Sequence, residues 1–160
     1  MWVIRGLKPL GITLLCVSCV SPGPLETGPL GFDKWFEATG TPITSFQAGI
    51  RFTNISSDPV TLRVANPCAA SVRAYEMPVE LTSRSWDQRV WDSGCHAGLA
   101  AVFLGPGAEY LALSGPISVA AILGDSLPSG QYEIIATVFS TDFPSGQIGI
   151  TAAQVELRRQ

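Results

Sequence analysis

From Phe46 onward, apolar and polar residues alternate in short runs that turn residues interrupt. In the run 47–54, Ala48, Ile50 and Phe52 fall on one face of an extended chain, and polar side chains fall on the other. This alternation is typical of strands with one buried face. The same reasoning predicts strands over 60–65, 71–76, 89–92, 100–104, 110–114, 133–139 and 148–157. About seven to eight short strands, with turns between them and no helical pattern, predict an all-β antiparallel sandwich.

Each predicted strand has one apolar face that we expect to contribute to the core. These inward residues are Ala48, Ile50, Phe52, Val60, Leu62, Val64, Val72, Ala74, Tyr132, Ile134, Ala136 and Val138. In the last strand the alternation changes phase after Gln154, which predicts a β-bulge before Val155 and Leu157. The aromatic segment 32–37 is expected to form a helical turn or a lead-in strand, and a turn quickly closes the apolar run 118–123.

The strongest local signal is the segment Leu127-Pro128-Ser129-Gly130-Gln131-Tyr132. It resembles the tyrosine corner of immunoglobulin-like sandwiches, in which a Leu, a Gly and a Tyr at these spacings form an arch before the penultimate strand. The resemblance implies that the Tyr132 hydroxyl bonds to nearby backbone, and that Leu127 and Gly130 shape the arch. The predicted fold is therefore an immunoglobulin-like antiparallel β-sandwich of about seven to eight strands.

Residues 1–18 have the pattern of an export signal. Arg5 and Lys8 supply a positive start, and residues 10–17 supply a short apolar run. That run is shorter than the roughly 20 apolar residues that a helix needs to span a bilayer. We therefore expect residues 1–18 to direct export, with the remaining chain outside the cytoplasm.

The end of this segment resembles the lipobox of bacterial lipoproteins, because the small residue Ser18 directly precedes Cys19 after the apolar run. The resemblance implies cleavage before Cys19 and a lipid on that residue, although Cys16 stands where that family usually has Leu. We expect a location in the bacterial cell envelope, with an N-terminal lipid anchor in a membrane. The alternatives are a secreted or periplasmic soluble protein, an uncleaved anchor, or a cytosolic protein with an apolar start.

Composition divides the exported part into two regions and restricts its partners. Residues 19–45 are expected to form a Pro/Gly-rich tether and lead-in, and residues 46–160 the sandwich domain. Removal of Arg5 and Lys8 leaves 8 basic and 13 acidic residues, so the net charge changes from −3 to −5. Nucleic acids and anionic lipid head groups are bound by clustered Lys and Arg. We therefore expect no nucleic-acid partner.

After loss of the signal and lipidation of Cys19, Cys68 and Cys95 remain as an even pair in an oxidising compartment. We expect a disulfide between them, which would add roughly 3–4 kcal/mol to stability by the loop-entropy model. A metal site or a reactive thiol is the alternative, because His96 follows Cys95 and Met77 is a soft ligand. Two adjacent side chains do not easily share one small ion, so we expect no metal and no other cofactor.

The order of several short motifs resembles the BsuPI-like (intracellular proteinase inhibitor) domain family. The motifs are Ile50-Arg51-Phe52-Thr53-Asn54, Asp58-Pro59-Val60-Thr61-Leu62, Ser71-Val72-Arg73-Ala74-Tyr75, Val90-Trp91-Asp92, Leu104-Gly105-Pro106-Gly107-Ala108-Glu109 and the Leu127–Tyr132 segment. The resemblance implies an immunoglobulin-like sandwich. Members of the family commonly carry a Trp shortly after the Pro-Gly turn, and residues 110–114 have none.

No catalytic motif stands out in the sequence: there is no nucleophile elbow, no zinc-binding His-Glu helix and no phosphate-binding Gly loop. The only histidine, His96, follows a cysteine of the predicted disulfide. Ser/His/Asp chemistry therefore has no evident centre, and we expect no enzymatic activity. The predicted function is that of a non-catalytic, envelope-tethered module that binds a protein.

The alternative function is a proteinase inhibitor that inserts an exposed loop into a protease. The polar connection 78–88 is the candidate loop, with Arg84, Ser85 and Trp86 as candidate contacts, since aromatics are enriched at binding hot spots. An ordinary surface connection and a structural accessory domain in an envelope complex are the further alternatives. Trp91, by contrast, is expected to pack in the core.

Overall fold

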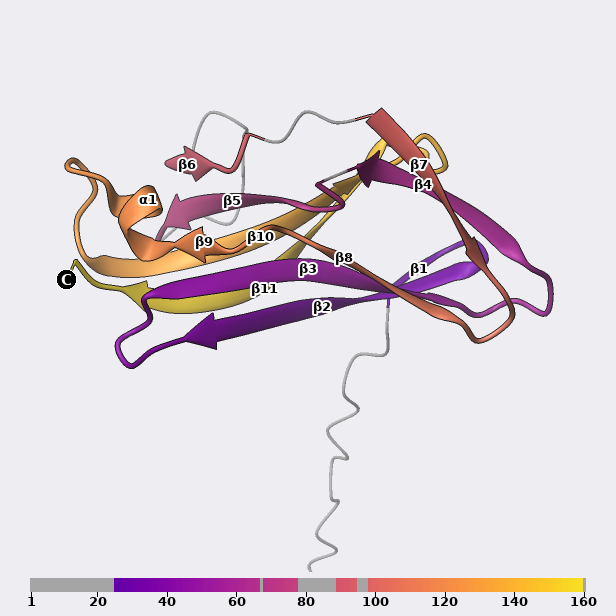
Figure 1. Cartoon of the computed structure of the whole chain (residues 1–160), viewed down its shortest axis with the longest axis horizontal. Helices are drawn as coiled ribbons and strands as arrows, with labels where there is room; N and C mark the ends of the chain where they lie inside the picture. Colours follow the sequence, from indigo (N-terminus) through magenta and orange to yellow (C-terminus); the bar gives the residue numbers. More distant parts are fainter. Residues whose placement is uncertain (1–24, 67, 78–88, 95–97, 160) are drawn as a thin grey trace, which may run out of the picture.

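The chain folds into two layers of antiparallel strands (Figure 1) in a computed structural model that describes residues 25–66, 68–77, 89–94 and 98–159. The first layer contains β1 (Leu25–Thr27), β2 (Leu30–Thr39), β3 (Ser45–Asn54) and β8 (Glu109–Leu113), in this order, and β9 (Ile117–Ser118) also pairs with β3. The second layer contains β11 (Gln147–Leu157), β10 (Gly130–Phe139), β5 (Ser71–Glu76) and β6 (Trp91–Asp92). The structure thus confirms an all-β antiparallel sandwich.

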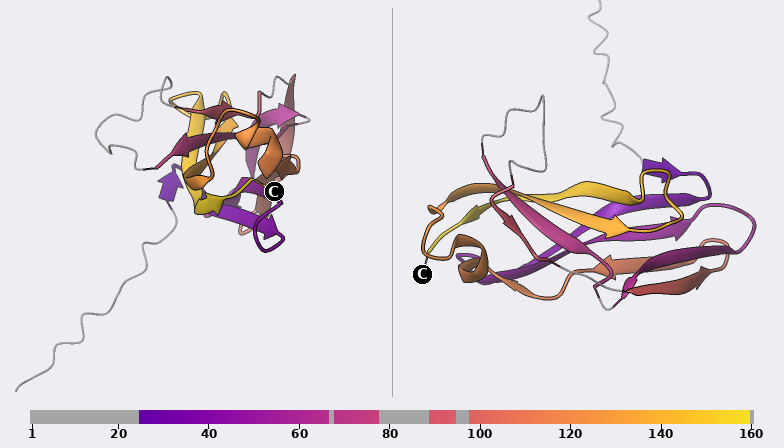
Figure 2. Two further views of the ribbon diagram at one scale, coloured as in Figure 1. Left: turned by 90° about the vertical axis from the view of Figure 1, so that its left-hand side faces the viewer. Right: turned by 90° about the horizontal axis from the view of Figure 1, so that it is seen from above.

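A separate ribbon of two strands, β4 (Val60–Asn66) and β7 (Gly98–Leu104), lies at the end of the sandwich opposite the helix α1 (Val119–Leu123) (Figure 1). Figure 2 shows the two layers enclosing the interior when the molecule is viewed from its end. Each strand predicted from the sequence has a counterpart in the structure. The strands β1 and β9 are additional to them, and β2 includes the lead-in strand that is one of the two structures expected for residues 32–37.

The core lies between the central strands of the two layers, β3 and β10, each of which is paired on both sides. The predicted inward faces are confirmed, because all of their residues are buried except Val60, which is half-buried. Phe52 and Ile134 are fully buried at the centre, and the Phe52 ring stacks on Phe143 with centroids 5.8 Å apart. Trp91, predicted as a core residue, is half-buried and packs against the edge of the core.

Two segments are more ordered than their sequence pattern indicates. Of the two structures expected for 32–37, the strand forms: β2 pairs with β3 from Leu30 to Thr39, so this lead-in is part of the first layer. The apolar run 118–123 is mostly helical, because the Ser118 hydroxyl accepts a hydrogen bond from the Ala121 N–H at 3.1 Å and caps α1.

The predicted bulge in the last strand is confirmed. Ile134 pairs with Ala153 and Ile135 pairs with Thr151, so Ala152 is an extra residue in β11. The extra residue changes the phase of the strand. Ile148 and Leu157 are an odd number of positions apart, so strict alternation would place them on opposite faces, yet both are buried.

The segment that resembles a tyrosine corner forms an arch before β10. Tyr132 is fully buried, and its hydroxyl donates a hydrogen bond of 2.7 Å to the Pro128 carbonyl. Leu127 is half-buried, and its N–H donates to the Leu123 carbonyl at 2.9 Å. Gly130 begins β10. The arch thus ties the end of α1 to the strand that forms the centre of the second layer.

Candidate protein-binding surface

Most residues with a function predicted from the sequence lie outside the described residues. These are Cys19, Arg84, Ser85, Trp86 and Cys95. Cys68 is described and is half-buried between β4 and β5. The lipid anchor, the contact loop and the Cys68–Cys95 disulfide therefore stay predictions.

The described residues reveal a different candidate surface, at the edge of the β4–β7 ribbon. The seven residues of β7 pair antiparallel with β4, which sets Phe103 opposite Thr61 and Leu99 opposite Ala65. Within the described residues, β4 is the only strand that pairs with β7. The other side of β7 therefore presents backbone N–H and C=O groups that no described strand uses.

The side chains of β7 alternate between two environments. Leu104 is buried, and Val102 is half-buried against the core. On the opposite face, Leu99 is 55% exposed, Ala101 is also exposed and Phe103 is 80% exposed. Phe103 is the most exposed large apolar side chain in the described part of the molecule. Exposed aromatic and aliphatic groups next to an open strand edge indicate a contact surface.

The composition of β7 is unusual for a sheet edge. Natural edge strands avoid unwanted pairing by means of charges, proline, bulges or short length. The sequence of β7, GLAAVFL, contains neither a charged residue nor proline. By contrast, β2 carries exposed Asp33, Lys34 and Glu37, and β11 carries exposed Glu156. The part of β2 beyond its pairing with β1 and the outer strand β11 thus carry exposed charges, and β7 carries none.

Hydrogen bonds from Asn54 fix the ribbon to the first layer. Asn54 is 1% exposed, and its amide nitrogen donates to the carbonyls of Asp58 at 2.8 Å and Leu104 at 3.0 Å. Its side-chain oxygen accepts from the Ser56 N–H at 2.9 Å. The Gly107 N–H donates to the Asn54 carbonyl at 2.8 Å. One residue thus holds the β3–β4 turn and the end of β7 together.

The other side of the ribbon is closed by the turn between β10 and β11. The backbone N–H of Arg63 in β4 donates to Asp142 Oδ2 at 2.6 Å, and its Nη1 donates to Asp142 Oδ1 at 2.8 Å. Asp142 therefore occupies a hydrogen-bonding position at the edge of β4. The ribbon thus has one edge that Asp142 caps and one that no described strand covers.

A groove of about 440 Å³ lies between the layers, beside β6 and the β8–β9 connection. Cys68, Trp91, Ser93 and Ser114 line part of it. Ser93 Oγ accepts from the Val72 N–H at 2.9 Å, and Ser114 Oγ accepts from Ala48 N–H at 3.1 Å. These hydroxyls already hold backbone groups, so the groove offers a ligand little free polar chemistry.

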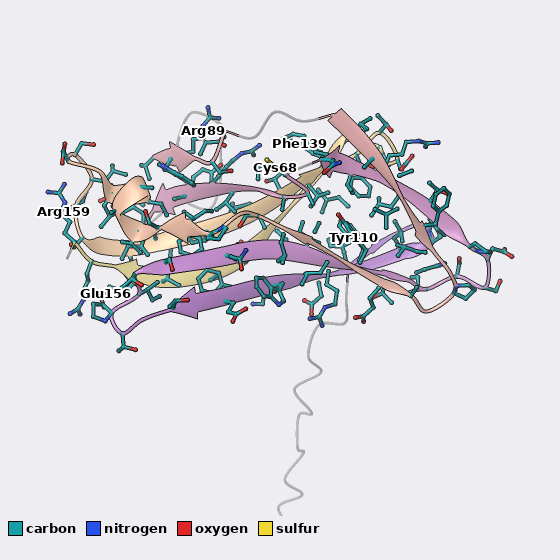
Figure 3. All side chains as sticks on the ribbon, in the orientation of Figure 1. Cys68, Arg89, Tyr110, Phe139, Glu156 and Arg159 are labelled. Atoms are coloured by element: carbon teal, nitrogen blue, oxygen red, sulfur yellow. The ribbon has the colours of Figure 1, made fainter. Side chains whose placement is uncertain are left out.

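Charged side chains also gather on the outer side of the second layer, where Figure 3 shows Arg89. Asp92 Oδ2 lies 3.7 Å from Arg73 Nε and 3.6 Å from Arg89 Nε. Glu133 is 1% exposed, and its Oε1 accepts a hydrogen bond from Thr151 at 2.7 Å. The carboxylates face guanidinium or hydroxyl groups of the protein itself, which is the arrangement of a structural network.

The described residues show neither a metal-binding cluster nor a membrane-spanning helix. They contain no group of three or more His, Cys, Asp or Glu residues arranged to hold a metal ion. They also contain no helix that is both long and apolar enough to cross a membrane. His96 lies outside the described residues, so the expected absence of a metal site is untested.

Comparisons with known proteins identify no family. No family model matches the chain, and no curated protein matches it. A crystal structure of an ApaA protein from Bordetella pertussis is similar over 81% of this chain and 92% of that chain, with 14% sequence identity and a TM-score of 0.36. A likeness at this level carries no argument about function. The resemblance to BsuPI-like domains stays a prediction.

The sequence predicts a strand over 100–104 but does not identify it as a contact surface. Every residue in this run is apolar, so alternation does not reveal which face is buried. The sequence shows only that the strand before the Gly105-Pro106-Gly107 turn has no charged residue. A buried central strand has the same property, so the sequence does not distinguish the two. Exposure of Phe103 emerges only from the pairing of β7 with β4.

Proposed function

We propose that this protein is a non-catalytic, protein-binding module that accepts an extended segment of its partner at the edge of β7 that no described strand covers. The single observation that carries the proposal is that β7 is an uncharged edge strand whose own Phe103 is 80% exposed. Strand addition uses backbone hydrogen bonds for affinity and alternate side chains for selectivity. Burying one large apolar side chain contributes roughly 1.5–3 kcal/mol to such binding before the costs of association.

The proposal includes an envelope location. Residues 1–18 direct export, Cys19 carries a lipid anchor, and the domain, which resembles BsuPI-like sandwiches, holds a Cys68–Cys95 disulfide. A periplasmic or secreted soluble form is the alternative location. The intact mass of the membrane-extracted protein, before and after reduction, tests the anchor and the disulfide together. A mass lacking residues 1–18 and gaining a diacylglycerol and an acyl group is expected, with a gain of about two protons on reduction.

Site-specific photocrosslinking in cells tests the binding surface. The full-length protein carries a photoreactive phenylalanine analogue at position 103, and a matched protein carries it at exposed position 34 of β2. We expect a discrete protein adduct from position 103 and none from position 34. Introduction of Ala101→Lys in the first protein should abolish the adduct, because a buried charge opposes strand pairing.

Equal labelling from positions 103 and 34 would overturn the proposal, since it would show that the adducts come from non-specific collisions and not from binding at β7. The same conclusion follows if the adduct survives Ala101→Lys in a folded protein. Residue 101 is exposed, so we expect its replacement to leave the core unchanged. Circular dichroism of both variants checks that the sandwich is intact.

A further inference from the structure

We infer that the segment bound at the free edge of β7 is β7 of a second copy of this chain, antiparallel about a two-fold axis through Ala101. This inference rests on the proposed binding role of β7 and adds the identity of the partner. A two-fold contact uses the same patch on both copies, so the patch must be complementary to itself. The charge, the register and the size of the β7 surface bear on this requirement.

The charge of the surface favours a copy of itself. No residue of β7 is charged, so two β7 strands align without repulsion between like charges. Arg63, which lies opposite Ala101 in the ribbon, is paired with Asp142 of its own subunit at 2.8 Å. β7 itself therefore presents no charged group that selects a basic or acidic peptide, and the half-exposed Arg63 side chain beside it is neutralised by Asp142. An uncharged apolar strand fits this surface.

The register of an Ala101-centred pair is also self-complementary. Ala101 is the middle residue of Gly98–Leu104, so this axis pairs all seven residues of each strand. It places Phe103 of one copy opposite Leu99 of the other, and the two Ala101 side chains opposite each other. The bulky exposed side chains thus meet aliphatic partners, and only methyl groups meet at the axis. Aromatic–aliphatic cross-strand pairs of this kind stabilise antiparallel sheets.

The size of the surface predicts weak pairing in dilute solution. An aromatic side chain buries about 150–250 Å² at most, and each copy contributes one Phe and one Leu to the contact. Stable dimers bury about 1,200 Å² or more in total. A shared membrane tether raises the effective concentration of the strands by orders of magnitude. Pairing is therefore expected between tethered copies, and it is best measured in the membrane.

Disulfide trapping of the full-length protein in host-cell membranes tests the pairing. Ala101→Cys places two sulfurs at the two-fold axis, within the roughly 7 Å between Cα atoms that a disulfide tolerates. We expect mild oxidation to give about tenfold more disulfide-linked dimer than in the parent protein or in Gln154→Cys, an exposed control on β11. The parent protein measures the background from native cysteines.

Two further variants test the register. Leu99→Cys and Phe103→Cys, each expressed alone, place identical residues four positions apart along the pair, or about 13 Å. We expect neither to dimerise above the parent level. Coexpressed with different tags, they should form a mixed disulfide, because position 103 of one copy lies opposite position 99 of the other.

The outcomes separate this inference from the proposed function. Trapping of Ala101→Cys no greater than that of Gln154→Cys overturns self-pairing. If the position-103 photoadduct then contains another protein, the binding role of β7 stands with a different partner. If that adduct is also absent, both proposals fail. Trapping of Ala101→Cys without the mixed 99–103 disulfide overturns the proposed register and with it the two-fold model.

Discussion

The strands β10 and β7 are both rich in apolar residues, but the protein uses them in opposite ways. β10 is paired with β11 on one side and β5 on the other, and even its outward Glu133 and Thr137 are buried. β7 has one strand partner among the described residues and exposes Phe103. Apolar composition in β10 therefore stabilises the fold. In β7, much of it stabilises nothing within the monomer, which makes it available to a partner.

Gly49→Ala is expected to have a large effect, because it disrupts the paired interior. Gly49 lies in β3 opposite Leu113 of β8, and a Cβ there would collide with the Ala112 carbonyl oxygen and meet Leu113 Cδ2 at 3.0 Å. Backbone atoms held in a sheet cannot easily move aside. We expect a loss of about 3 kcal/mol or more in the free energy of unfolding, measured by urea denaturation.

Gly149→Ala in β11 is the matched control for that substitution. A Cβ at position 149 would meet Thr137 Oγ1 at 3.4 Å, an ordinary contact distance. We expect a change of less than about 1 kcal/mol. Similar losses for the two variants would show that the close approach between β3 and β8 is not what requires Gly49.

Asn54→Ala comes next, because it releases the ribbon from the interior. The variant leaves the carbonyls of Asp58 and Leu104 without their amide donor and removes the acceptor of the Ser56 N–H. We expect a loss of roughly 2–3 kcal/mol, since buried groups lose their partners. Hydrogen exchange should increase in β4 and β7 more than in β10. Uniform acceleration in all three strands would contradict a separate role for Asn54 in holding the ribbon.

Tyr132→Phe has a smaller expected effect, at the start of β10. Loss of the 2.7 Å hydrogen bond to the Pro128 carbonyl should cost about 1 kcal/mol at neutral pH. Burial raises the pKa of Tyr132 above its ordinary 10.0, the Glu76 carboxylate raises that pKa further, and Arg159 lowers it. The raised pKa makes a stabilising contribution that is complete below pH 10 and is lost as the pH rises through the folded-state value.

The pH dependence of stability therefore shows whether the Tyr132 hydroxyl contributes beyond the packing of its ring. The free energy of unfolding of the parent protein should fall more steeply above pH 10 than that of Tyr132→Phe. Burial also raises the pKa of Tyr110, which contributes equally to both proteins. Parallel curves for the two proteins would show that the Tyr132 hydroxyl does not titrate differently in the folded and unfolded states.

The same contrast explains which parts of the molecule are predictable from sequence. Ala48, Ile50 and Phe52 alternate with polar residues, so their burial follows from the period of a strand. The bulge at Ala152 is also predictable, because the alternation of apolar and polar residues changes phase before Val155. Local patterns suffice where each strand has one buried and one exposed face.

Pattern fails where a segment's environment depends on distant residues. The mixture of charged and aromatic residues in 32–37 leaves a helical turn and a strand equally open, and the strand forms because β3 pairs with ten residues of β2. The exposure of Phe103 depends on the position of β7 at the edge of the ribbon, and position in a sheet is not encoded in a uniformly apolar run. The candidate surface could therefore be identified only from the strand pairing in the structure.

Phe103→Ala has the smallest expected effect on stability and completes the comparison when it is set beside Phe52→Ala. The two substitutions remove the same atoms, but Phe52 is fully buried and Phe103 is 80% exposed. We expect a loss of roughly 3–5 kcal/mol for Phe52→Ala and under about 0.5 kcal/mol for Phe103→Ala. Cross-linking through Ala101→Cys should nevertheless decline when Phe103→Ala is added, because in the proposed pair the ring packs against Leu99 of the other copy. A loss above about 1 kcal/mol for Phe103→Ala would mean that its ring packs within its own subunit, and β7 would then have no free apolar face to offer a partner.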